Sequence, residues 1–106
     1  MSEPRKTQGA SAPPRVLVVE DEDALGVLLQ YNLEAEGYVV ERAARGDDAE
    51  LALVENPPDL VILDWMLPGL SGLEVCRRLR AREATRTLPV IMVTARGEEG
   101  ERVRGL

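Results

Sequence analysis

The sequence contains no histidine, one cysteine and a single lysine, Lys6, near its N-terminus. Without histidine the chain cannot carry a phosphohistidine, a histidine-centred catalytic triad or a histidine-based zinc site. The one cysteine, Cys76, allows no internal disulfide and is typical of a reducing compartment. No apolar run approaches the roughly 20 residues that a membrane-spanning helix needs, and there is no signal-peptide core. We therefore expect a cytoplasmic domain without membrane contact.

Composition indicates one small α/β domain. Acidic residues outnumber basic ones by 19 to 13, and the net charge of -6 argues against binding of nucleic acid or an anionic membrane by this chain itself. Hydrophobic residues make up 44% of the chain and aromatic residues 3%, which fits an aliphatic core. Residues 1–14 lack apolar periodicity and are predicted to be a disordered tail before a domain that covers residues 15–106.

Two runs of large aliphatic residues, 16–19 and 60–63, predict strands buried on both faces, as in the middle of a parallel sheet. Both strands run into carboxylates, Glu20 and Asp21 after the first and Asp64 after the second. Residues 38–43 and 88–93 predict two further strands, of which 38–43 is less apolar and belongs nearer the sheet edge.

Leucine and alanine at helical spacing predict three helices between these strands. The expected caps are Asp23, then Asp47 or Asp48, then Ser71, and the helices are expected to end near Gly37, Asn56 and Arg82. The side chains expected to face inward are Leu25, Leu28, Leu29 and Leu33, then Ala49, Ala52 and Leu53, then Leu73, Cys76 and Leu79. A further helix is expected to begin at Glu98. This order of elements predicts a doubly wound parallel sheet with helices on both faces.

Three predicted strands deliver polar residues to one edge of this sheet: Glu20 and Asp21, Asp64, and Thr94. The first and third strands are neighbours in a doubly wound sheet, so Asp21 and Asp64 should lie close together. Two unit charges about 4 Å apart repel by roughly 4 kcal/mol at an effective dielectric constant near 20, so the site needs a cation or a proton. Carboxylates without histidine or cysteine favour Mg²⁺, to which the backbone carbonyl of Met66 is a natural further donor.

Acidic residues between a strand and a helix also serve as helix caps, and for Glu20 or Asp21 alone this interpretation is equally acceptable. Asp64 precedes a proline-containing loop and caps no obvious helix, which favours the metal site. Thr94 alone is typical of a simple strand end. The acidic residues interpreted as purely structural are Asp47, Asp48 and Asp59.

Three motifs resemble those of the receiver domain of two-component response regulators. They are Val-Val-Glu-Asp-Glu at 18–22, Leu-Asp-Trp-Met-Leu-Pro-Gly-Leu-Ser-Gly at 63–72 and Val-Thr-Ala-Arg at 93–96. The segments at 64–69 and 94–99 are similar to those of the phosphate-regulon branch of the winged-helix transcription regulators. The resemblance extends from about Arg15 to Leu106 and implies a flavodoxin-like parallel sheet of strand order 2-1-3-4.

The resemblance also implies a role for each site residue. Asp64 would accept a phosphoryl group from a phosphohistidine on a sensor histidine kinase, which must act in trans because this chain has no histidine. Asp21, Asp64 and the Met66 carbonyl would bind Mg²⁺, and Glu20 would hold metal-bound water. Thr94, with Ala95 beside it, would sense the phosphoryl group. The domain would be a signalling module rather than an enzyme, relaying to a DNA-binding output domain absent here.

Receivers carry a lysine at the end of a fifth strand, and this sequence ends before it. We therefore expect a truncated receiver without the fifth strand and last helix, in which Lys6 does not replace the missing lysine. A phosphorylation-incompetent fragment that docks on a kinase or dimerises is the alternative. A bare fourth-strand edge predicts self-association through that edge or the C-terminal segment. A nucleotide-binding enzyme is disfavoured, because the turn after the first strand is acidic and lacks a glycine-rich phosphate cradle.

Overall fold

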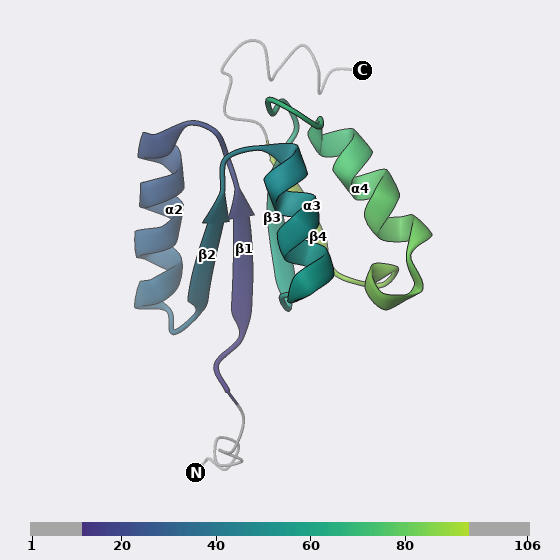
Figure 1. Cartoon of the computed structure of the whole chain (residues 1–106). Coiled ribbons are helices and arrows are strands. Elements are labelled where there is room, and N and C mark those ends of the chain that lie inside the picture. Colours follow the sequence, from purple (N-terminus) through teal and green to yellow (C-terminus); the bar gives the residue numbers. More distant parts are fainter. Residues whose placement is uncertain (1–11, 94–106) are drawn as a thin grey trace.

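Four parallel strands form one sheet in a computed structural model that describes residues 12–93. The strands are β1 (Arg15–Val19), β2 (Val39–Ala43), β3 (Leu60–Asp64) and β4 (Val90–Val93). They lie in the order β2-β1-β3-β4, so β1 and β3 are central and β2 is an edge strand (Figure 1). The predicted order 2-1-3-4 and the predicted edge position of residues 38–43 are confirmed.

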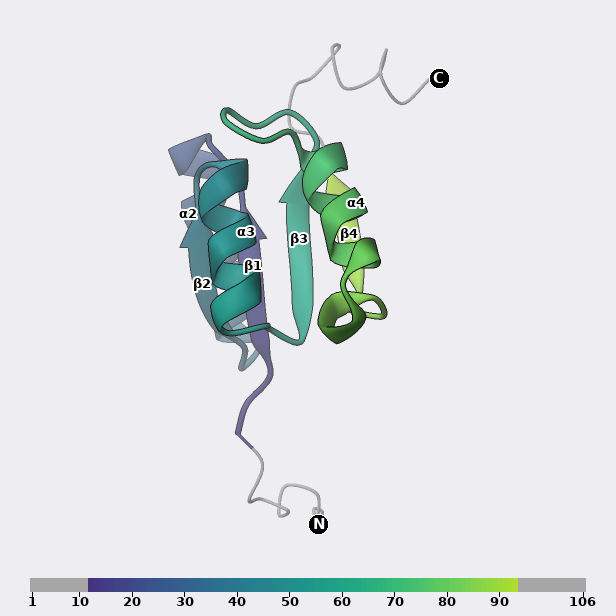
Figure 2. The same ribbon diagram turned by 45° about the vertical axis from the view of Figure 1, so that its right-hand side comes forward.

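Helices lie on both faces of the sheet. They are α2 (Asp23–Ala35), α3 (Gly46–Glu55) and α4 (Gly72–Ala81), followed by the short 3₁₀ helix η2 (Glu83–Thr85). Helices α3 and α4 lie side by side on one face, and α2 packs on the other next to β2 (Figures 1 and 2). Among the described residues, no helix has the length and apolar character to cross a membrane.

Alternate residues of the central strands supply two separate parts of the core. One part joins the sheet to α3 and α4 and consists of Leu17, Val19, Val61 and Leu63 with Ala49, Leu53, Val75 and Leu79. The other lies under α2 and is built on Val16, Val18 and Ile62, with the half-buried Leu29 and Leu33 packed against it. This alternation explains why the sequence of β1 and β3 is continuously apolar: both faces are covered.

One predicted helix cap is confirmed and two are wrong. The Oγ of Ser71 accepts a hydrogen bond from the Glu74 N–H at 3.2 Å. The N-cap of α2 is Glu22, which makes no side-chain capping bond, and Asp23 is the first residue of the helix and pairs with Arg42. Helix α3 begins at Gly46, so Asp47 and Asp48 lie inside its first turn. The predicted helix ends are confirmed: Asn56 is the C-cap of α3, Arg82 is the C-cap of α4, and Gly37 follows α2 with a positive φ of 99°.

The buried faces of two helices differ from the prediction. In α4 the fully buried side chains are Val75 and Leu79, while Leu73 is 48% exposed and Cys76 is half-buried. A Cβ at Gly72 would overlap the backbone oxygen of Asp64, so close contact at that glycine fixes the rotation of the helix. In α2, Leu28 is 54% exposed. In α3 the predicted inward face is confirmed, with Ala49 and Leu53 buried.

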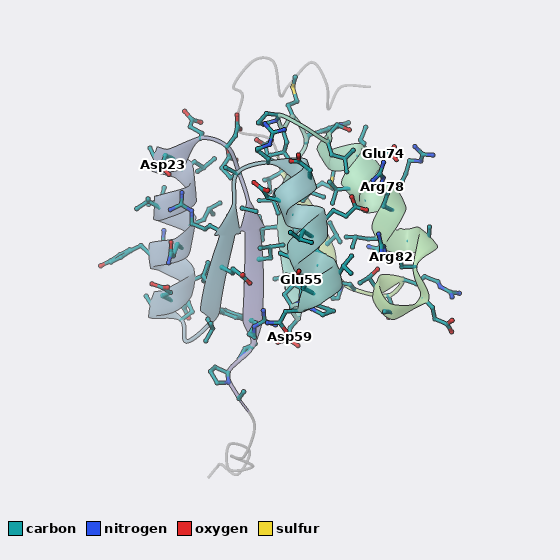
Figure 3. The ribbon with its side chains drawn as sticks, viewed as in Figure 1. Asp23, Glu55, Asp59, Glu74, Arg78 and Arg82 are labelled. Atoms are coloured by element: carbon teal, nitrogen blue, oxygen red, sulfur yellow. The ribbon has the colours of Figure 1, made fainter. Side chains whose placement is uncertain are left out.

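Ion pairs tie α3 to α4 on the surface. Glu50 of α3 accepts hydrogen bonds from Arg78 at 2.9 Å and from Arg82 at 3.0 Å. Arg78 also contacts Glu74 within its own helix, and Figure 3 shows these two side chains next to each other on α4. Two predicted segments, residues 1–11 of the tail and the helix from Glu98, lie outside the described residues.

Candidate functional site

Three acidic side chains meet at the carboxyl ends of β1 and β3. Glu20 and Asp21 follow β1, and Asp64 ends β3, whose Leu63 is paired in register with Val19. One carboxylate oxygen from each of the three residues lies within 4.8 Å of the others. The predicted proximity of Asp21 and Asp64 is confirmed, and Glu20 belongs to the same cluster.

The cluster is closed on one side and open on the other. Asp64 is fully buried and Glu20 is 3% exposed, whereas Asp21 is exposed to solvent. Glu20 Oε2 accepts a hydrogen bond from the Glu22 N–H at 2.9 Å. Glu20 Oε1 is buried and accepts no hydrogen bond from the described residues. A buried carboxylate oxygen without a partner is energetically costly, which indicates that a cation or a proton belongs at this position.

The surroundings of Glu20 favour its protonated form. Burial raises the pKa of Glu20 to about 7, and the negative charges of Asp64 and Asp21 act in the same direction. The hydrogen bond from the Glu22 N–H opposes this rise in pKa. Because metal ligands must be deprotonated, a cation at this cluster would compete with a proton near neutral pH.

The backbone after β3 holds Asp64 in place. The Met66 N–H donates to Asp64 Oδ1 at 3.2 Å, so the Met66 backbone lies next to the acidic cluster. The Trp65 N–H donates to the Val93 carbonyl of β4 at 3.0 Å, and the Trp65 carbonyl accepts from the Gly72 N–H at 3.0 Å. The only sequence signal for this close backbone contact is the glycine directly after the Ser71 cap.

Asp59 lies away from this site, at the opposite end of β3 (Figure 3). Its Oδ2 accepts a hydrogen bond from the backbone N–H of Arg15 at 2.8 Å, so it fastens the start of β1 to the start of β3. The structural interpretation of Asp59 is confirmed. Thr94 and Ala95 lie outside the described residues.

Comparison with known proteins identifies the family to which the chain belongs. The family model of the response regulator receiver domain matches residues 16–106. The chain belongs to this family. Its parallel sheet of order β2-β1-β3-β4 is therefore the sheet of a receiver domain.

Relatives in the phosphate-regulon branch are similar over most of the chain. The phosphate regulon transcriptional regulatory protein PhoB of Rhizobium meliloti is 68% identical over 93 residues, which cover 88% of this chain and 41% of that protein. The PhoB protein of Escherichia coli is 48% identical over 92 residues, covering 87% of this chain and 40% of that protein. The chain thus spans about two fifths of the length of these relatives.

Solved receiver structures have the same fold. A putative response regulator from Chloroflexus aurantiacus superposes with a TM-score of 0.79 at 38% identity, covering 89% of this chain and 77% of that one. The receiver domain of a sensor histidine kinase from Pseudomonas aeruginosa has a TM-score of 0.78 at 32% identity, covering 87% and 75%. That structure has a magnesium ion coordinated in its active-site cleft.

The acidic cluster of this chain suits the same ion. All three side chains offer hard carboxylate oxygens, and one of these oxygens is buried without a hydrogen-bond partner among the described residues. No histidine or cysteine contributes to the cluster, so it lacks the nitrogen and sulfur ligands that soft and borderline metals prefer. The residues present therefore fit Mg²⁺, which binds through one or two carboxylates and retains water.

Proposed function

We propose that this receiver domain accepts a phosphoryl group on Asp64 in a Mg²⁺-dependent reaction. The observation that carries the proposal is the position of Asp64, fully buried at the end of β3 and within 4.8 Å of two other carboxylates. A cation bound by carboxylates that include the nucleophile can neutralise the negative charge on the oxygens of the transferred phosphoryl group. The donor is a phosphohistidine on a sensor histidine kinase, which acts in trans because the chain has no histidine.

In the proposed reaction, a carboxylate oxygen of Asp64 forms a bond to phosphorus while the bond between phosphorus and the donor imidazole nitrogen breaks. The imidazole leaves with the electron pair of that bond and takes up a proton, and the product is an acyl phosphate on Asp64. The hydrogen bond from the Met66 N–H to Asp64 Oδ1 fixes the orientation of the nucleophile.

Mg²⁺ would be held by Asp21, Asp64 and the backbone carbonyl of Met66, with Glu20 acting through a water molecule. The ion would neutralise negative charge on the oxygens of the transferred group. Thr94 and Ala95, which are outside the described residues, are proposed to contact the phosphoryl group on the basis of the resemblance of residues 93–96 to the receiver motif.

The output of this signal is proposed from the relatives. They are transcriptional regulatory proteins, and this chain spans about two fifths of their length. We propose that DNA binding belongs to the remaining part of such a protein and that signalling takes place in the cytoplasm. Self-association through β4 or the C-terminal segment stays a prediction; β4 pairs with β3 alone among the described strands. No observation favours a docking fragment over a phosphoacceptor.

Phosphorylation can be tested without knowledge of the kinase. The chain is incubated with Mg²⁺ and acetyl phosphate, and the adduct is located by intact mass and peptide mapping. We expect one phosphoryl group on Asp64, and no adduct in Asp64→Asn or after chelation of the metal. An adduct that persists in Asp64→Asn, or its absence from the unaltered chain, would contradict the proposal. Binding of Mg²⁺ is measured in parallel by the fluorescence of Trp65.

A further inference from the structure

The loop that carries Met66, residues 65–71, rests on the N-terminal end of α3. We infer that Gly46, the first residue of α3, is a positioning residue for the metal site, because it provides the surface on which this loop is seated. The inference depends on the proposed Mg²⁺ site. Figure 2 shows the loop after β3 extending toward the start of α3, although the two segments are more than 15 residues apart in the chain.

The contact at Gly46 is between two backbones. The Gly46 N–H donates a hydrogen bond to the Pro68 carbonyl at 3.1 Å. A Cβ on Gly46 would overlap the backbone oxygen of Leu70 and would lie 2.5 Å from its carbonyl carbon. Since real Cβ atoms keep about 3.4 Å or more from such atoms, any side chain at position 46 must displace the loop backbone. Glycine is therefore required for the observed loop position.

A second contact lies next to the first. Gly69 has a positive φ of 81°, and a Cβ on it would lie 2.7 Å from Asp47 Oδ1 and 2.8 Å from Arg45 Nη2. Arg45 and Asp47 form a two-point ion pair, at 3.0 Å and 3.2 Å, that covers the Cα of Gly69. The ion pair between the two residues that flank Gly46 therefore packs against the loop at Gly69.

The same connection between β2 and α3 also contacts the other half of the acidic cluster. The Ala43 carbonyl, at the end of β2, accepts a hydrogen bond from the Glu20 N–H at 3.0 Å. Three residues later the chain reaches Gly46 and the loop contact. Residues 43–46 therefore hydrogen-bond to both parts of the proposed site. Ala43 contacts the segment that carries Glu20 and Asp21, and Gly46 contacts the loop that carries Met66.

Displacement of the loop should reach the metal ligands. Pro68 lies two residues from Met66, and the loop is tied at its start by the Met66 N–H bond to Asp64 and at its end by the Gly72 N–H bond to Trp65. Because Pro68 is only two residues from Met66, displacement of the loop backbone at Pro68 should also shift the backbone carbonyl of Met66, the proposed Mg²⁺ ligand. Changes in the residues that orient metal ligands typically reduce metal affinity by about 10- to 100-fold.

The test compares Gly46→Ala with the unaltered chain and with Gly37→Ala. Gly37 ends α2, has a positive φ of 99° and has no atom within 4 Å of an added Cβ, so its substitution strains the backbone without touching the loop. Mg²⁺ affinity is measured by titration of Trp65 fluorescence, under conditions in which circular dichroism shows each variant folded. We expect Gly46→Ala to weaken Mg²⁺ binding at least tenfold and Gly37→Ala to leave it within twofold of the unaltered chain.

A readout without metal separates positioning from loss of stability. In the absence of Mg²⁺, the backbone amide resonances of Trp65 and Met66 should shift in Gly46→Ala and stay in place in Gly37→Ala. A folded Gly46→Ala chain with unchanged affinity and unchanged amide resonances overturns the inference. If Gly46→Ala does not fold, Asp47→Ala, which removes the ion pair over Gly69, is expected to weaken binding a few-fold, and unchanged affinity there overturns the inference as well.

The proposed function and this inference fail in different ways. Absence of Mg²⁺ binding in the unaltered chain overturns the metal site and the positioning role with it. Normal Mg²⁺ binding in the unaltered chain together with normal binding in Gly46→Ala overturns the positioning role alone.

Discussion

Acidic residues in this domain differ in role according to the strand end at which they lie. Asp59 precedes β3, and its carboxylate accepts a backbone hydrogen bond from Arg15. Asp64 ends the same strand, is fully buried and shares a cluster with Glu20 and Asp21. Sequence reasoning could separate these roles because strand direction alone decides which end faces the site. It could not reveal the burial of Glu20, which depends on how the loops after β1 and β3 pack.

Glu20 should make the metal-free protein less stable as the pH rises. Unfolded glutamate titrates near pH 4.5, whereas the pKa of Glu20 in the folded chain is raised to about 7. Between these values the folded state binds more protons than the unfolded state, so the free energy of unfolding falls as pH rises from about 4.5 to about 7. The loss should be of the order of 2–3 kcal/mol, measured by urea unfolding without Mg²⁺ across this range.

Glu20→Gln is the matched control for this pH dependence. Glutamine keeps the size of the side chain and cannot ionise, so the variant should lack the fall in stability and should exceed the unaltered chain at pH 8. Saturating Mg²⁺ at pH 8 should restore stability to the unaltered chain, because the ion binds the folded state. A pH dependence that is identical in both chains would show that Glu20 is not the group responsible.

Local sequence predicts some helix ends and buried helix faces but not others. The Ser71 cap was predictable, because its hydroxyl bonds a backbone N–H three residues later in the same helix. The start of α3 was not, because its N-cap Arg45 makes no side-chain capping bond and the Gly46 N–H instead bonds the Pro68 carbonyl of a distant loop. The rotation of α4 was ambiguous for the same reason: Leu73 and Val75 are both apolar, and contact of Gly72 with the Asp64 backbone decides which is buried.

Ser71→Ala should destabilise α4 measurably. Loss of the hydroxyl leaves the Glu74 N–H without its capping bond, at a cost of about 1 kcal/mol in the free energy of unfolding. Asp23→Ala is the control, since Asp23 makes no capping bond and its exposed pair with Arg42 is worth about 0–1 kcal/mol. Thermal unfolding should show a larger decrease in melting temperature for Ser71→Ala. A melting temperature that is unchanged in Ser71→Ala would mean that the capping bond contributes no stability in solution.

At the scale of the whole molecule, the sheet and its order follow from features that act over short distances. Continuous aliphatic runs mark β1 and β3, proline and glycine mark the turns, and right-handed crossovers leave few ways to join four parallel strands. How α3 and α4 pack against each other could not be predicted, because this packing depends on contacts between side chains that are far apart in the sequence. Ion pairs from Glu50 to Arg78 and Arg82 are among these contacts.

Two leucines of α3 test how much the helix layer contributes to the stability of the domain. Leu53 is fully buried in the cluster shared with the sheet and α4, and Leu51 is 57% exposed. Leu53→Ala should lower the free energy of unfolding by about 2–5 kcal/mol, because it removes buried contacts and leaves a cavity. Leu51→Ala makes the same chemical change in the same helix and should stay within about 0.5 kcal/mol of the unaltered chain.

The same two substitutions also test whether core packing affects the proposed metal site. Neither leucine belongs to the acidic cluster, so saturating Mg²⁺ should raise the free energy of unfolding of Leu53→Ala by the same increment as in the unaltered chain. Urea unfolding with and without Mg²⁺ measures both quantities. A smaller increment in Leu53→Ala would mean that packing of α3 against the sheet also sets the geometry of the metal ligands, which would extend the role of this helix beyond its first residue.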